Sequence, residues 1–192
     1  MADPSDLTTL TNLKQWLNVT NANDDTLLSR LITATSNYIQ MWLNRTIPVA
    51  SYSDYRDGSD GVTMVLKNYP IISVSSLTID GNVIPPSVPS PPGSLDPPGF
   101  VFDQFSIMLV GGTYAFTRGY QNIFIQYQAG YSVIPFEIEQ ACIELASMRY
   151  RERDRIGQVS KNIGGEIVSY SQKGLSDAIQ SVLSDYQRVI TP

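Results

Sequence analysis

The spacing of apolar residues changes twice along this 192-residue sequence, and the change limits the possible folds more than any other feature. Between residues 24 and 44 apolar side chains recur every three or four positions, which predicts an amphipathic helix of about five turns. Residues 47–131 instead hold short runs of β-branched residues between Asp-Gly turn signals, which predicts strands. Helical spacing returns after Pro135, so the strand-rich segment is an insertion between helices.

Helices and strands can be assigned to residue ranges from these patterns. Helices are expected at residues 9–17, 24–44, 135–155 and about 175–189. Strands are expected at residues 62–66, 72–79, 100–109, 114–117 and 123–127, with turns at Asp57-Gly58, Asp60-Gly61 and Asp80-Gly81 and a hairpin at Gly111-Gly112. Asn23 or Asp24 is expected to cap the second helix by accepting from its free N–H groups. The predicted fold class is α+β and mainly helical: a helical-bundle body with an inserted β-rich middle segment and a C-terminal amphipathic helix.

Two parts are expected along the chain. Residues 1–156 form a core that contains the first three helices and the insertion, and residues 157–192 form a C-terminal arm and helix. Seven of the twelve prolines fall between residues 85 and 98. Proline removes a backbone donor and fixes φ, so this stretch cannot lie inside a sheet. It is either an extended surface loop or an arm that contacts a neighbouring subunit, and the sequence leaves both open.

The sequence contains no histidine and a single cysteine, Cys142. Catalytic triads, Cys-His pairs and most zinc sites need these residues, so those kinds of chemistry are excluded. Cys142 lies on the apolar face of the third helix and is expected to be an inert core side chain. The net charge of −5 disfavours binding of nucleic acid through its phosphates. No signal peptide and no membrane-spanning run is visible, and the lone cysteine suits a reducing cytoplasm.

Two surfaces near the C-terminus are candidate binding sites. The third helix ends in alternating arginines: Arg149, Arg151, Arg153 and Arg155. They form either a basic patch for phosphates or an acidic partner, or a helix end whose cations pair with Glu152 and Asp154. The last helix carries an apolar stripe: Leu175, Ile179, Val182, Leu183 and Tyr186. Such a helix docks in a groove, either one in its own chain or one in a neighbour.

The β-rich segment contains two weaker candidate sites. Asp54, Asp57 and Asp60 suggest a calcium site, but their spacing does not fit a calcium-binding loop and two of them precede glycine, so turn formation is favoured. A hydrolase that uses Asp54 and Asp57 is the least favoured alternative. A carbohydrate- or receptor-binding module is a second alternative, with tyrosines as stacking platforms: Tyr52, Tyr55, Tyr114, Tyr120 and Tyr127.

The order of several segments resembles the head–tail connector, or adaptor, proteins of tailed phages and of gene transfer agents. Residues 10–17 (LTNLKQWL) and 24–28 (DDTLL), with the long helix that follows, resemble the N-terminal part of that family. Residues 69–74 (YPIISV) and 123–131 (IFIQYQAGY) resemble its middle. Residues 166–171 (EIVSYS) and the closing helix resemble the C-terminal part of longer members. The likeness covers nearly the whole chain, although the proline-rich stretch departs from the short members.

The resemblance implies a structural protein of the virion neck, made in the cytoplasm of a bacterial host. Copies would form a ring below the portal protein, twelve-fold to match it, that extends the DNA channel and offers a docking surface to the next neck or tail-completion protein. An acidic surface would let DNA pass without sequence-specific binding. In such adaptors the C-terminal segment engages the portal, which points to the stripe from Leu175 to Tyr186 as a portal-facing or intersubunit surface. The resemblance also implies a protein that is not an enzyme, needs no cofactor and does not contact a membrane.

Overall fold

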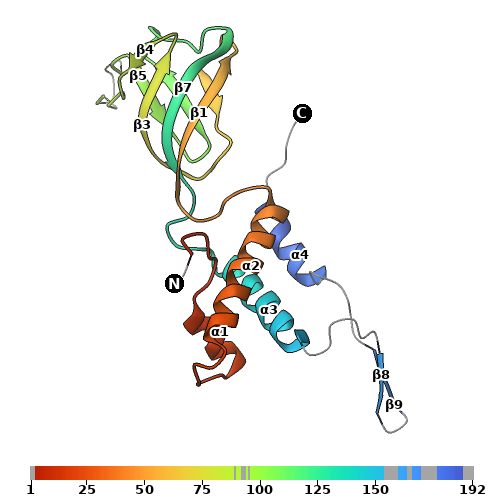
Figure 1. The fold of residues 1–192 in the computed structure, drawn as a ribbon. Coiled ribbons are helices and arrows are strands. Elements are labelled where there is room, and N and C mark those ends of the chain that lie inside the picture. Colours follow the sequence, from red (N-terminus) through yellow and green to blue (C-terminus); the bar gives the residue numbers. More distant parts are fainter. Residues whose placement is uncertain are drawn as a thin grey trace. The chain divides into compact units, whose positions relative to one another are not determined.

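The computed structural model describes residues 3–88, 90–91, 94, 96–153, 160–163, 166–169 and 177–187. The chain forms two compact units (Figure 1). The helical unit comprises Met1–Pro48 and Val133–Pro192, and the β unit comprises Val49–Ser132. The β unit is therefore a continuous insertion between two helices. The predicted boundary between residues 156 and 157 lies outside the described residues and stays a prediction.

The helical unit is built on an apolar core that its first three helices share. Its described helices are α1 (Leu10–Leu17), α2 (Asp25–Leu43), α3 (Phe136–Glu152) and α4 (Asp177–Ser184). One apolar cluster joins α1, α2 and α3 and contains Leu13, Leu28, Ile32, Ile143 and Ala146. These residues recur at helical spacing, so each helix presents one apolar stripe to its neighbours. Between α3 and α4 the chain forms an antiparallel pair of strands, β8 (Ser160–Ile163) and β9 (Glu166–Ser169).

The ends of the first two helices explain where they stop. Asn18 after α1 and Asn44 after α2 have left-handed φ values of 56° and 55°, and their N–H groups bond carbonyls of the last helical turn. The start of α2 differs from the prediction. Asp24 occupies the cap position, but its side chain makes no cap bond. Its Oδ2 instead accepts from the Tyr150 hydroxyl at 2.6 Å, so this carboxylate joins the start of α2 to the end of α3.

The β unit consists of two antiparallel sheets on one shared core. The first sheet has the order β1 (Ala50–Gly58), β7 (Gly119–Ala129), β3 (Ile71–Ile79) and β4 (Asn82–Ile84). The second has the order β2 (Thr63–Val65), β6 (Ser106–Val110) and β5 (Gly99–Phe102). Both sheets contribute apolar side chains to the core, among them Ile125 of β7 and Ile107 of β6, which are fully buried. Two sheets that each bury one face form a stable unit by this packing.

The prediction of a mainly helical fold with a helical-bundle body was wrong. Strands hold about as many of the described residues as helices do. The β unit also has a buried apolar core to which both of its sheets contribute. The inserted segment therefore has an interior of its own. A long amphipathic helix repeats its apolar spacing over several turns, whereas a short strand contains few repeats and so gives a weaker signal.

The glycine turns are confirmed only in part. Asp80-Gly81 joins β3 to β4 as a two-residue hairpin in which both residues have positive φ, 49° and 80°. Gly58 instead ends β1. Gly111-Gly112 follows β6 and leads toward β7 in the other sheet, so it does not close a hairpin between paired strands. The strand expected at residues 114–117 is absent from the described structure, where Phe116 instead forms an isolated β-bridge with Gly61.

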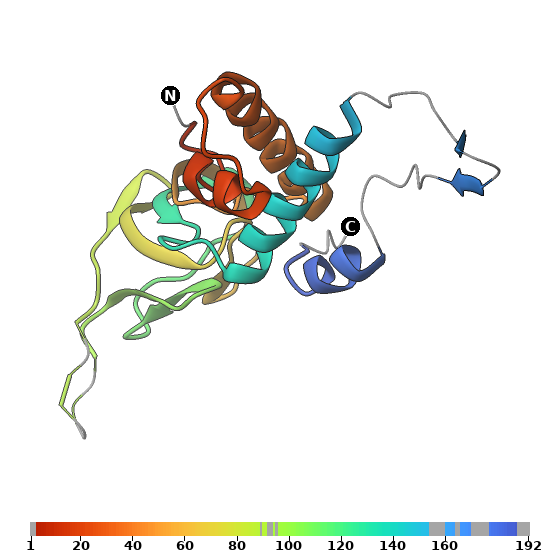
Figure 2. The same ribbon diagram turned by 90° about the horizontal axis from the view of Figure 1, so that it is seen from below.

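The proline-rich stretch forms a two-legged extension of the β unit, here called the proline arm (Figure 2). Its described legs are residues 85–88 and 96–98. The first leg is bonded to β5: Phe100 N–H donates to Pro85 O at 3.0 Å, and Ser87 N–H donates to Phe100 O at 2.8 Å. The base of the arm is therefore fixed to the sheet by backbone hydrogen bonds. A role in contacting a neighbouring subunit stays a prediction.

Candidate functional site

The closing helix α4 packs on the helical unit of its own chain. Ile179 and Leu183, two members of the predicted stripe, are buried, with 6% and 0% of their surface exposed. Beyond the helix, Gln187 Nε2 donates to the Trp42 carbonyl at the end of α2, at 3.1 Å. The buried side of α4 thus packs on its own helical unit, and docking on a neighbouring copy stays a prediction.

The other members of the stripe have different surroundings. Tyr186 is half-buried, and its hydroxyl donates to Glu137 Oε2 at the start of α3, at 3.3 Å. Val182 keeps 43% of its surface exposed, and Leu175 lies outside the described residues. An assembly role for the stripe stays a prediction. Val182 is the apolar member that remains most accessible among those described.

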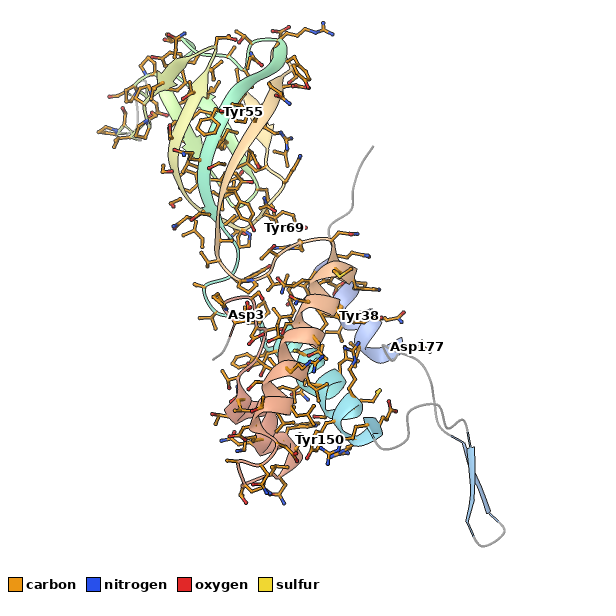
Figure 3. All side chains as sticks on the ribbon, in the orientation of Figure 1. Asp3, Tyr38, Tyr55, Tyr69, Tyr150 and Asp177 are labelled. Atoms are coloured by element: carbon orange, nitrogen blue, oxygen red, sulfur yellow. The ribbon has the colours of Figure 1, made fainter. Side chains whose placement is uncertain are left out.

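Two of the four arginines at the end of α3 contact aromatic rings of their own chain, those of Tyr38 and Tyr150, which are labelled in Figure 3. The Arg149 guanidinium lies 5.2 Å from the centroid of the Tyr38 ring on α2. The Arg153 guanidinium lies 4.6 Å from the centroid of the Tyr150 ring. Both distances are within the range of cation–π attraction, which stabilises such pairs by about 0.5–1 kcal/mol at exposed sites.

Arg153 also takes part in the link between α2 and α3. Its Nη1 lies 3.6 Å from Asp24 Oδ1. The same carboxylate accepts the Tyr150 hydroxyl, and this hydrogen bond raises the pKa of the Tyr150 phenol. These contacts join the end of α3 to α2, and the partners differ from the Glu152 and Asp154 that the sequence suggested. Arg151 is exposed and Arg155 lies outside the described residues, so a basic patch for a partner stays a prediction.

An open groove lies between α1 and α3, and we call it the α1–α3 groove. Its volume is about 610 Å³, and its walls are Asn12, Gln15, Trp16, Phe136, Glu139, Gln140 and Ile143. Two aromatic rings in it are unusually accessible: Trp16 is 51% exposed and Phe136 is 80% exposed. Exposed aromatic side chains that line a concave surface are typical of binding sites.

Sequence reasoning missed this groove. Trp16 lies at the apolar helical spacing of α1, so the pattern alone does not distinguish it from a core residue. The available signal was Phe136, an aromatic residue in the first turn of α3 that lies outside the buried stripe of that helix. Glu139 on the groove wall is held by two donors, Asn12 Nδ2 at 2.6 Å and Thr8 Oγ1 at 3.1 Å. These bonds join α3 to α1 and to the residues before it.

The tyrosines proposed as a sugar-stacking platform do not share one face of the β unit. Tyr127 is buried, and Tyr52 stacks on it with ring centroids 5.3 Å apart. Tyr55, labelled in Figure 3, is 63% exposed. Its ring packs against Phe124 instead, with ring centroids 4.7 Å apart. Because Tyr52 and Tyr55 are three residues apart on β1, they point to opposite faces of the sheet.

Tyr127 is the centre of a polar cluster inside the β unit. Its hydroxyl donates to Asp54 Oδ2 at 2.9 Å and accepts from Asn68 Nδ2 at 3.0 Å. Burial, with a smaller contribution from Asp54, raises the pKa of Tyr127. The phenol therefore stays protonated and keeps its role as a donor. Asp54 of β1 is thereby joined to β7 and to the loop before β3.

Replacing Tyr127 by phenylalanine is expected to reduce the free energy of unfolding by about 1–3 kcal/mol, because Asp54 and Asn68 lose their shared partner. Urea denaturation followed by far-ultraviolet circular dichroism measures the change. The matched control is Tyr55→Phe, at a hydroxyl on an exposed side chain, where the effect is expected to stay within about 0.5 kcal/mol. Equal effects of the two substitutions would contradict the role of the cluster.

The other predicted carboxylates bond backbone N–H groups that lie far away in the sequence. Asp57 Oδ1 accepts from Gln121 N–H at 2.6 Å, and Asp60 Oδ1 accepts from Arg118 N–H at 2.8 Å. Within the described ranges there is no cluster of three or more residues of the metal-binding types. No helix in the part of the chain that the structure describes has both the length and the apolarity to cross a membrane.

Cys142 lies in the interior of the helical unit, as expected. It is 0% exposed, and its Sγ lies 3.4 Å from Thr35 Oγ1 and 3.5 Å from Ser36 Oγ on α2. Burial raises the pKa of this thiol, so the reactive thiolate is disfavoured. The side chain joins α2 to α3 and offers no nucleophile to a substrate.

Comparison with known proteins gives one family and one fold. The family model described as "Head completion protein" matches residues 6–189. A chain of "Virion of native gene transfer agent (GTA) particle" is similar in structure, with TM-score 0.57, 12% identity, and coverage of 100% of this chain and 94% of that one. A chain of "Neck of native GTA particle computed with C12 symmetry" has TM-score 0.56, 13% identity and the same coverage of 100% and 94%. No curated protein sequence matches this chain.

A third solved structure has the same likeness. A chain of "Neck of empty GTA particle computed with C6 symmetry" has TM-score 0.55 and 12% identity, and the match covers 95% of this chain and 90% of that one. At such low identities these structures show a shared fold alone. The match to the family model is independent of them and spans nearly all of the sequence.

Proposed function

This chain belongs to the head completion protein family, and we propose that its copies form a ring below the portal in the neck of a tailed phage or phage-like particle. Family membership confirms the resemblance to phage head–tail connectors that the sequence suggested, and it makes the chain a structural component of a virion. The ring, its partners and its channel are the proposed part.

The observation that carries the proposal is the extent of the family match, residues 6–189, because it includes both units and the closing helix. The similar chains from gene transfer agents support a ring, since their necks were computed with C6 and C12 symmetry. We propose twelve copies on that basis. Identical subunits that contact each other head to tail close into a ring when the rotation between them fits.

The proposed ring extends the DNA channel of the portal and provides the docking surface for the next neck or tail-completion protein. The net charge of −5 per copy supports the passage of DNA without tight binding. An acidic protein attracts DNA phosphates weakly and releases few of their counterions. No catalytic role is proposed. The buried Cys142, the structural Asp57 and Asp60, and the lack of histidine all agree with a scaffold.

The proposal is tested by mixing the purified full chain with the portal protein of the same particle. Electron microscopy without imposed symmetry is expected to show a ring of twelve copies on one end of the portal. Sedimentation of the mixture gives the stoichiometry independently. A chain that neither binds the portal nor enters particles when supplied to a mutant lacking it would contradict the proposed function.

A further inference from the structure

We infer that the α1–α3 groove of one copy binds the proline arm of the next copy in the ring. The inference rests on the proposed function and deepens it, since it names the two surfaces that meet between copies. The groove belongs to the helical unit and the arm belongs to the β unit. Two different surfaces on one chain are what a head-to-tail contact between identical copies requires.

The proline arm has the properties of a preformed ligand. Proline fixes φ, so a proline-rich segment loses little conformational freedom when it binds. The legs are also joined to each other, because Ser87 Oγ donates to Pro97 O at 2.7 Å. Gly99 at the base allows the close approach of the first leg, since a Cβ there would lie 2.5 Å from Pro85 O. The arm therefore extends from a fixed base.

The surface of the arm is apolar and almost uncharged. Val88 on the first leg is 71% exposed. Residues 85–98 contain one charged side chain, Asp96, and its Oδ1 accepts from Ser90 N–H at 2.8 Å. Because Pro85 O and Pro97 O already accept hydrogen bonds within the β unit, the surface left for a partner consists mainly of the proline rings and Val88.

The α1–α3 groove has the chemistry that recognises such a segment. Proline-rich segments dock in grooves lined by aromatic rings, and their carbonyls accept hydrogen bonds from side-chain donors. Trp16 and Phe136 supply the exposed rings, and the indole N–H and the amide of Gln15 are donors on the same wall. The volume of about 610 Å³ is in the range of pockets that bury small ligands or short segments.

The test uses two substitutions and a matched control for each. Phe136→Ser removes a groove ring that is 80% exposed, and Tyr120→Ser removes a ring of the β unit that is 82% exposed. Val88→Asp places a charge on the arm, and Val83→Asp places one on β4 at a valine with the same exposure, 71%. Native mass spectrometry of the full-length variants over a concentration series measures self-association.

Phe136→Ser and Val88→Asp are each expected to weaken self-association by about tenfold or more, as truncation of an aromatic or apolar anchor does. Tyr120→Ser and Val83→Asp are expected to associate like the wild type. A mixture of Phe136→Ser and Val88→Asp tests the contact most directly. Phe136→Ser keeps an intact arm and Val88→Asp keeps an intact groove, so an equimolar mixture is expected to form one-to-one heterodimers and no larger ring.

Three results would overturn the inference: a wild type that never self-associates, normal association of either Phe136→Ser or Val88→Asp, or a mixture without heterodimers. Portal binding of the same variants is measured in parallel. It distinguishes a failure of the arm contact from a failure of the proposed function. Variants that bind the portal but associate normally leave the ring proposal standing and refute the arm contact. A wild type that binds neither the portal nor itself refutes both.

Discussion

Substituting alanine for Gly58 is expected to destabilise the β unit by about 3 kcal/mol or more, because the added methyl group has no room. A Cβ at this position would lie 1.7 Å from Thr117 O and 2.9 Å from Phe116 O. Both are backbone atoms, so no side-chain rotation can relieve the clash. The strand β1 must separate locally from the segment that leads into β7.

The opposing segment cannot easily move away. Phe116 is fully buried, its N–H donates to Gly61 O at 2.9 Å, and its carbonyl accepts from Asp60 N–H at 2.8 Å. Gly58 itself donates its N–H to Asn122 Oδ1 at 3.1 Å. Relief of the clash therefore breaks hydrogen bonds or shifts a core ring. Each of these adds about 1 kcal/mol or more to the loss.

The two units provide separate signals for this measurement. Both tryptophans, Trp16 and Trp42, belong to the helical unit, so their fluorescence follows its unfolding, whereas far-ultraviolet circular dichroism follows both units. Gly58→Ala is expected to lower the denaturation midpoint seen by circular dichroism more than that seen by fluorescence. Gly61→Ala is the control, because the nearest atom to its Cβ is 3.6 Å away. Similar midpoints for the two variants would contradict the packing argument.

Gly58 also shows what sequence patterns can and cannot predict. Asp57-Gly58 has the composition of a turn, and a turn was predicted there. The reason for this glycine is instead the approach of a distant backbone segment, Phe116 to Thr117, which no local pattern encodes. Asp80-Gly81 was predicted correctly because a tight hairpin depends only on its own two residues.

Strand β1 was missed for a related reason. Its inner residues include Tyr52 and Asp54, which are not typical of a buried strand face. Asp54 is acceptable there because the Tyr127 hydroxyl, 73 residues away, donates to its carboxylate. The long helix α2, in contrast, carries its apolar stripe within its own 19 residues and was predicted nearly to its ends. Local signals were recognised, and long-range partners were not.

The candidate site follows the same rule. The apolar stripe of the closing helix was predicted, but its docking on α3 depends on residues 40 or more positions away, such as Glu137. The arginines were predicted as a group, whereas the structure pairs Arg149 with Tyr38 of another helix. The α1–α3 groove was not predicted, since a groove between two helices exists only once both have packed.

Ile179→Asp is expected to change the stability of α4, whereas Val182→Asp is expected to change binding to a partner. Ile179 on α4 is 6% exposed. An unpaired carboxylate at this position is expected to destabilise the packing of α4 by about 2–4 kcal/mol, through lost apolar contacts and lost hydration of the charge. That is enough to release a helix of eight residues from α3. Hydrogen exchange of the intact chain is expected to show lost protection at residues 177–187, with little change in the β unit.

Val182 is 43% exposed, so Val182→Asp is expected to change stability by no more than about 0.5 kcal/mol. If the exposed side of α4 contacts the portal or a neighbouring copy, the same substitution weakens that binding by about tenfold, because it places a charge in an apolar interface. Ser181→Asp, one residue earlier and also exposed, controls for charge alone. Wild-type portal binding and wild-type self-association of Val182→Asp would leave α4 as an internal brace of the helical unit. Weakened binding with a stable fold would make α4 a link between the subunit core and its partner, because the buried and the exposed sides of one short helix would then serve folding and assembly separately.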